Sequence, residues 1–217
     1  MKKLLRMVCL LAFFCLLFGQ GAEATREIMY KPLRVAQFPL QLQGRMMPAH
    51  FVQDKLGKMV DRSLHVPLNG TLEIVQFIPE KECLLVLEAV KEEAAPKTSM
   101  KDLMRPVAEE LKADLVVMPI LDGYEQYQTM SWHLWGRHIS HSYASVRVLG
   151  YDRKKDEVFS KTATRQFNDE YSSQGDVSVL AYEAMEEALR RAEIHERVWD
   201  WKLTKAGYGS AKFFPHH

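Results

Sequence analysis

The hydrophobic positions along this chain fall into two patterns, and their order predicts the fold. Short apolar runs bounded by turn residues are typical of strands, and apolar residues that recur every three or four positions are typical of helices. The first pattern predicts strands at 34–40, 71–77, 114–121, 139–151 and 158–167. The second pattern predicts helices at 48–64, 79–92, 99–111 and 177–194.

This order of elements is strand, helix, strand, two helices, three strands, helix. It predicts a single α/β domain in which helices pack on a mixed β-sheet of about five strands. The last two strands flank the polar turn 152–156 and are expected to form a hairpin. Pro119 has no amide to donate, so the third strand should either have an interrupted ladder there or lie at an edge of the sheet.

The first 24 residues have the three parts of a secretory signal peptide. A basic start is followed by an apolar run at 7–18, and Ala22-Glu23-Ala24 places small residues at the two positions that a signal peptidase recognises. We expect cleavage after Ala24, a domain at 25–206 and a flexible C-terminal tail at 207–217. No later apolar run reaches the ~18 residues of a membrane-spanning helix. The short Lys-rich start is typical of bacteria, so we expect export to the periplasm, the cell surface or the medium.

Charge and cysteine content make several classes of function unfavourable. The signal takes three of the 29 basic and one of the 28 acidic residues with it, which leaves a balance near −1. A chain this neutral has no general attraction to nucleic acid or to anionic membranes. Cys83 is the only cysteine after the signal, so we expect a buried, unreactive thiol and no disulfide. A lipid anchor at Cys9 or Cys15 is not expected, because bulky residues precede both.

Three phrases of the sequence are similar to a known envelope module. They are Arg-Val-Ala-Gln-Phe-Pro at 34–39, Ala-Asp-Leu-Val-Val-Met-Pro-Ile at 113–120 and Val-Arg-Val-Leu-Gly-Tyr-Asp at 146–152, closed by the final helix. Together they resemble the α/β domain shared by the curli-secretion lipoprotein family and the amino-terminal domain of the TolB protein. The resemblance covers roughly 34–194 and implies a non-enzymatic envelope domain that docks to other proteins. The lipid-anchoring cysteine of the family and a pore-forming insertion are absent, which argues against a secretion channel.

The sequence has no catalytic motif: no Gly-x-Ser-x-Gly elbow, phosphate loop, His-Glu-x-x-His or Cys-x-x-Cys. This favours a non-enzymatic role without excluding an enzyme, because the fold can bring catalytic groups together. The rival interpretation is a periplasmic enzyme that acts on a wall or glycan component, with Asp122, Glu125 and His141 as candidates. We expect no cofactor and no metal. His138 and His141 would point to opposite faces of a strand, and His133 would lie far from His141 in an extended segment.

The segment 124–143 concentrates the aromatic and basic side chains that dominate binding interfaces. The candidate binding residues are Tyr124, Tyr127, Trp132, His133, Trp135, Arg137, His138 and His141. One interpretation is a hairpin mouth that grips an envelope protein or a glycan, and the other is a connection whose aromatics cover the sheet. A homo-oligomeric subunit that associates through the hairpin edge is a further alternative. The sequence thus favours an exported envelope module that acts in protein binding or assembly.

Overall fold

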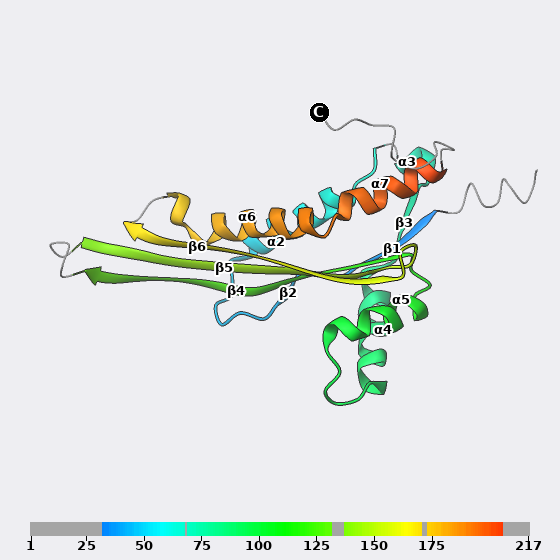
Figure 1. Ribbon diagram of the computed structural model, residues 1–217, viewed down its shortest axis with the longest axis horizontal. Coiled ribbons are helices and arrows are strands. Elements are labelled where there is room, and N and C mark those ends of the chain that lie inside the picture. Colours follow the sequence, from blue (N-terminus) through cyan, green and yellow to red (C-terminus); the bar gives the residue numbers. More distant parts are fainter. Residues whose placement is uncertain (1–31, 68, 132–136, 171–172, 206–217) are drawn as a thin grey trace, which may run out of the picture.

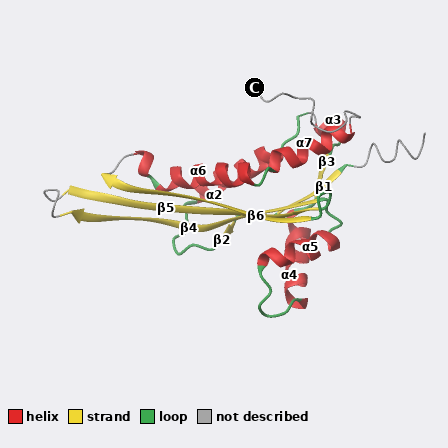
Figure 2. Cartoon of the chain, viewed as in Figure 1, coloured by secondary structure: helices red, strands yellow, loops and turns green. Residues whose placement is uncertain are grey.

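Six strands form one open, mixed sheet that carries helices on both faces (Figures 1 and 2). The computed structural model describes residues 32–67, 69–131, 137–170 and 173–205. The expected single α/β domain is confirmed, and the sixth strand is the two-residue β2. The elements are β1 (Leu33–Gln37), β2 (Gln41–Leu42), α2 (His50–Leu64), α3 (Asn69–Leu72), β3 (Val75–Phe77), α4 (Glu80–Glu93), α5 (Met100–Glu110), β4 (Leu115–Ser131), β5 (Arg137–Asp152), β6 (Glu157–Glu170), a 3₁₀ turn η2 (Ser173–Gly175), α6 (Val177–Arg191) and α7 (Ile194–Lys205). The expected signal peptide and the tail at 207–217 lie outside the described residues.

The sheet is parallel at one end and antiparallel at the other. β1 pairs in parallel with β3 on one side and β4 on the other, whereas β4, β5 and β6 form an antiparallel meander that contains the expected hairpin. Pro119 lies between Val117, the last partner of β1, and Ile120, the first partner of β2. The ladder is therefore interrupted on that side of β4, where proline has no amide to donate.

The helices divide the core into two layers (Figure 2). α2, α6 and α7 cover one face of the sheet, called here the α6 face, and α4 and α5 cover part of the other, called here the α5 face. Helices α2 and α5 bury the stripes that their sequence spacing predicts. In α2 the buried residues are Val52, Leu56, Val60 and Leu64. In α5 they are Leu103, Met104, Val107 and Ala108, and the Ser99 side chain caps the helix by accepting the amide of Asp102.

The prediction of a strand over 71–77 is wrong in its first half. Residues 69–72 form the single helical turn α3, and β3 begins only at Val75. The Asn69 side chain causes this, because its Nδ2 donates to the Val75 carbonyl (2.8 Å) and its Oδ1 accepts the Val75 amide (2.7 Å). Glu73 takes a positive φ of 46° as the chain reverses. The Asn-Gly pair thus opens a capped turn that uses up the start of the expected strand.

The expected lengths of the third strand and the final helix are also wrong. β4 continues past residue 121 to Ser131, because β5 pairs with it along its whole length. A separate helix, α7, follows α6 after Glu193, which has a φ of 54°. Trp199 and Trp201 therefore lie within a helix rather than after the last one, and the Trp199 ring stacks on His195 at a centroid distance of 5.7 Å.

Helix α4 is less buried than its apolar composition suggests. Cys83, Leu87 and Val90 are buried, but the Leu85 side chain is 63% exposed. Helix α4 packs beside α5 at the edge of the domain, so only one of its faces is covered (Figure 1). The expectation of a buried Cys83 is confirmed. Its burial, together with the charge of Glu82, raises the pKa of the thiol to about 11.

Candidate functional site

The segment singled out by sequence forms the end of a long projection of the sheet. In Figure 1 the strands β4, β5 and β6 run on to the left, beyond the parallel strands β1 and β3. We call residues 123–131 of β4, 137–145 of β5 and 164–170 of β6 the arm. Of the candidate binding residues, Tyr124, Tyr127, Arg137, His138 and His141 lie on the arm. Trp132, His133 and Trp135 lie outside the described residues, between the ends of β4 and β5.

A β-bulge decides which side chains of the arm are buried. The pairing of β4 with β5 shifts between Leu121 and Gly123. The β4 residues that point to the α6 face therefore have odd numbers before the bulge and even numbers after it. Tyr124 consequently joins the core of the α6 face and is only 8% exposed. Burial raises the pKa of its hydroxyl, and the charge of Asp176 adds to this effect. Tyr127 falls on the opposite face and is 57% exposed, so the aromatic segment supplies both core and surface.

Tyr127 and His141 form an ordered pair on the exposed face of the arm. They are cross-strand partners, and their rings stack with centroids 4.9 Å apart and an interplanar angle of 17°. His141 Nε2 lies 2.8 Å from Thr129 Oγ1, and its Nδ1 lies 2.9 Å from Asn168 Oδ1. The imidazole is thus held at both nitrogens and by its ring face. This fixes the Tyr127 ring on the surface at little further entropic cost.

Tyr143 is held beside this pair by a glycine. A Cβ added at Gly123 would lie only 2.4 Å from the Tyr143 ring, so the ring crosses the strand where no side chain stands. Tyr143 remains 40% exposed. The exposed face of the arm therefore presents two tyrosine rings in fixed positions, framed by polar side chains.

Most of the exposed apolar surface in the described part of the chain gathers at the arm. Eight large apolar or aromatic side chains are exposed in the described part of the chain. Six of them belong to the arm or to the segment 46–51, which leads from β2 into α2. They are Met46, Met47, Phe51, Tyr127, Met130 and Tyr143. A Cβ built on Gly44 would lie 3.5 Å from the amide nitrogen of Tyr124, so the chain passes directly beside the start of the arm just before it enters this segment. Gathered apolar side chains of this kind mark interaction surfaces.

The two edges of the arm differ. The pairing of β4 with β2 ends at Leu121, and no described strand pairs with the outer side of residues 123–131. The β6 edge is partly blocked, because Arg191 of α6 donates to the Thr162 carbonyl (2.8 Å) and Arg165 donates to the Thr164 carbonyl (3.2 Å). The open edge is therefore the one beside the exposed apolar side chains.

The candidates for catalysis have structural partners. Asp122 pairs with Arg147 at 2.6 Å beside the bulge, and His141 is held as described above. Glu125 is the cross-strand partner of Tyr143 and does not face His141 directly. Four cavities lie within the described part of the chain, and Asp122, Glu125 and His141 line none of these four.

The histidines of the segment are separated. His138 is the cross-strand partner of Met130, whereas His141 is the partner of Tyr127 on the other face. Within the described ranges, no group of three or more His, Cys, Asp or Glu side chains could hold a metal ion. In the same part of the chain, no helix combines the length and the apolar character needed to cross a membrane.

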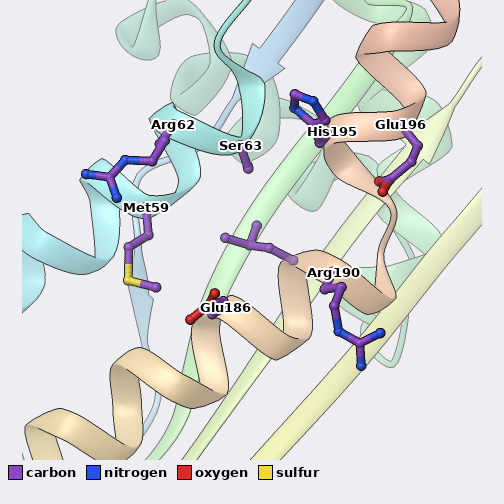
Figure 3. Close-up of a pocket in the computed structure, with 8 residues that line it drawn as sticks. Met59, Arg62, Ser63, Glu186, Arg190, His195 and Glu196 are labelled. Carbon is purple, nitrogen blue, oxygen red and sulfur yellow. The ribbon is translucent and has the colours of Figure 1, made fainter. Parts of the chain in front are cut away.

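A cavity of about 350 Å³ lies away from the arm, between α2, α6 and α7 (Figure 3). Its floor includes Met59 and Leu189, and its rim carries charged groups. The guanidinium groups of Arg62 and Arg190 point away from one another in Figure 3. Arg190 is held by Glu187 at 2.7 Å, with its side chain 70% exposed. The two guanidinium groups therefore do not converge on one ligand.

No family model matches the chain, and no curated protein matches it in sequence. Several solved structures of low sequence identity are similar to it in part. A hypothetical protein from Chlamydia trachomatis is 16% identical over 75% of this chain and 96% of its own, with a TM-score of 0.44. PelC from Paraburkholderia phytofirmans, a dodecamer, is 13% identical over 73% of this chain and 85% of its own, with a TM-score of 0.37. A lipoprotein from Neisseria meningitidis is 13% identical over 73% of this chain and 99% of its own, with a TM-score of 0.33. The resemblance to the curli-secretion and TolB families stays a prediction.

Sequence reasoning missed the apolar residues that flank the arm. Met46, Met47 and Phe51 precede the buried stripe of α2 and do not share its spacing, which begins at Val52. The sequence does hold a signal for these residues. They are large and apolar and lie next to a helical stripe, but they do not share its spacing, so the helix does not bury them.

Proposed function

We propose that this chain is an exported protein of the bacterial cell envelope that acts by binding another protein through the arm. The secretory pattern of the first 24 residues supports export. The observation that carries the binding role is the gathering of exposed apolar side chains on and beside the arm. Methionine and tyrosine suit such a surface, since methionine adapts to irregular partners and tyrosine offers a large, stiff ring.

The proposed binding surface wraps around the unpaired β4 edge of the arm. It includes the Tyr127–His141 pair and Tyr143 on one face, Met130 on the other face, and the segment 46–51. The proposal also includes Arg137, at the start of β5, and Trp132, His133 and Trp135, which lie outside the described residues, since Trp, Tyr and Arg are enriched among residues that dominate binding energy. His138 belongs to the proposed surface as the neighbour of Met130 across the strands. Tyr124 is buried in the core of the α6 face, so in this proposal it supports the surface by packing.

A photo-cross-linking amino acid placed at Tyr127 in living cells tests this proposal. The matched control is the same amino acid at Leu85, which is equally accessible but lies on α4. We expect a discrete cross-linked species from position 127 that is absent from position 85. The species should disappear when Met130 and Tyr143 are both changed to serine in a protein of unchanged unfolding midpoint. Equal cross-linking from both positions would contradict a binding role for the arm.

Self-association is a second candidate, because the outer side of β4 residues 123–131 has no partner strand in the described structure. An open edge of this length can add a strand from another copy. The same experiment separates the two candidates: mass spectrometry of the cross-linked species shows either this chain alone or this chain joined to another.

A further inference from the structure

A second cavity opens where two neighbouring parallel strands diverge. β1 leads through the short strand β2 to α2 on the α6 face, whereas β3 leads through Pro79 to α4 on the α5 face. The two strands lie side by side at the right end of the sheet in Figure 1. The cavity lies on the α6 side of these strands, beside the chain that connects α2 to β3.

This cavity has a volume of about 350 Å³, within the range of small-ligand sites. Gln37, the last residue of β1, lines it together with Val75 and Phe77, the first and last residues of β3. Asp61 and His65, from the C-terminal end of α2 and the residue after it, line the opposite side. The cavity thus lies between the strands β1 and β3 and the C-terminal end of α2.

The polar groups of the cavity are rich in hydrogen-bond acceptors. Gln37 Nε2 donates to Asp61 Oδ1, and this bond holds the two side chains together. It leaves the amide oxygen of Gln37 and the second carboxylate oxygen of Asp61 without a hydrogen-bond partner among the residues that the structure describes. The His65 imidazole can accept or donate. Asn69 is fixed by its two bonds to Val75, so this wall is rigid.

The remaining wall of the cavity is apolar. Phe77 contributes a ring that is 46% exposed, and the buried side chain of Val66 lies beside it. Acceptors on one side and a partly exposed ring on the other suit a ligand with several hydroxyl donors and a flat C–H face. The Asp61 carboxylate disfavours an anionic ligand by repulsion.

We propose that this cavity binds a neutral sugar ring. Asp61 and Gln37 accept hydrogen bonds from neighbouring hydroxyls of the sugar, and its C–H face packs on Phe77. None of these residues belongs to the arm, so the site is independent of the proposed protein-binding surface.

Titration calorimetry and saturation-transfer NMR on the purified protein test the proposal. The probes are glucose, N-acetylglucosamine and its β-1,4-linked trimer, with glycerol and N-acetylneuraminic acid as controls for a simple polyol and an anionic sugar. We expect saturable binding of at least one neutral sugar and none of the two controls. Tighter binding of the trimer than of the monomer would identify a glycan chain as the source, and equal binding would identify a free sugar.

Variants locate the site. Asp61→Asn keeps an acceptor for Gln37 but loses the charge, and Phe77→Ala removes the ring; each should weaken binding about tenfold, as the loss of one such contact implies. Asp54→Asn on the exposed side of α2 and Leu85→Ala on α4 are the matched controls and should bind normally. Met130→Ser on the arm should also bind normally, which separates this site from the arm.

Three outcomes would overturn the sugar site: no saturable binding of any neutral sugar, binding of glycerol or of the anionic sugar with equal strength, or equal affinities in all variants. Urea unfolding midpoints within error of the parent protein ensure that a loss of binding reports on the site.

Discussion

Arg197 of α7 and Asp152 at the end of β5 form a buried ion pair, with Nη1 and Oδ2 2.7 Å apart and side chains only 4% and 9% exposed. The same guanidinium donates two further hydrogen bonds, one from Nη2 to Glu157 Oε2 and one from Nε to the carbonyl of Ala192, each at 3.0 Å. It also lies over the Phe159 ring at 4.5 Å from the centroid. One side chain thus joins α7 to both strands of the β5–β6 hairpin.

We expect Arg197→Met to lower the free energy of unfolding by about 3–5 kcal/mol, because it leaves the buried Asp152 carboxylate without its charged partner. Urea unfolding followed by circular dichroism measures this. The control is Arg190→Met, which should cost far less, because this side chain is 70% exposed and its ion pair with Glu187 is screened by solvent. Equal costs for the two variants would show that the buried pair contributes no more than a surface pair.

The stability should depend on pH through Glu157. The hydrogen bond from Arg197 lowers the pKa of this carboxyl in the folded protein. A lowered folded pKa contributes stability above the unfolded value of about 4.3, and this contribution is lost as the pH falls through the folded value. The effect is modest, since the Glu157 side chain is 45% exposed and solvent screens the pair.

Glu157→Gln tests this dependence. The variant should show a shallower decline in the free energy of unfolding than the parent as the pH falls below about 4.3. Urea titrations at several pH values, with Glu92→Gln on the exposed side of α4 as the control, measure it. Parallel pH profiles for Glu157→Gln and the parent would contradict the assignment.

Replacing Gly150 and Gly57 by alanine should change the free energy of unfolding in opposite directions. A Cβ at Gly150 would lie 2.2 Å from the Val116 carbonyl oxygen and 2.3 Å from the Phe159 ring, so Gly150→Ala should destabilise the protein by several kcal/mol or prevent folding. A Cβ at Gly57 in α2 would meet nothing within 4 Å. Gly57→Ala should therefore raise the free energy of unfolding by about 0.5–1 kcal/mol, because alanine favours the helix. Thermal unfolding midpoints that move the same way in both variants would refute this contrast.

The Cys83 thiol should be unreactive until the protein unfolds. It is buried, and burial raises its pKa to about 11, so almost none of it is thiolate at pH 8. A chromogenic disulfide reagent should label it slowly in buffer and quickly in urea. As a control, peptide mapping of the labelled product should show that the reagent is attached at Cys83. Rapid labelling in buffer alone would show that the α4 layer opens readily.

The sequence alone determined the class of fold and much of the local structure. The spacing of Val52, Leu56 and Val60 marked the buried face of α2, and Ser99 marked the start of α5. The polar turn 152–156 marked the hairpin. These features depend on a few neighbouring residues, because helix periodicity, capping and turns are local properties of the backbone.

The tertiary structure decided what local patterns do not contain. Residues 122–131 have no strand-like alternation of apolar positions, and they extend β4 only because β5 lies beside them. The bulge between Leu121 and Gly123 sends Tyr124 into the core and Tyr127 to the surface, although the two side chains are chemically alike. The cavity of Gln37, Asp61 and Phe77 joins residues from three separate elements. Exposure and convergence depend on which distant segment covers a side chain, so they emerge only when the whole chain has packed.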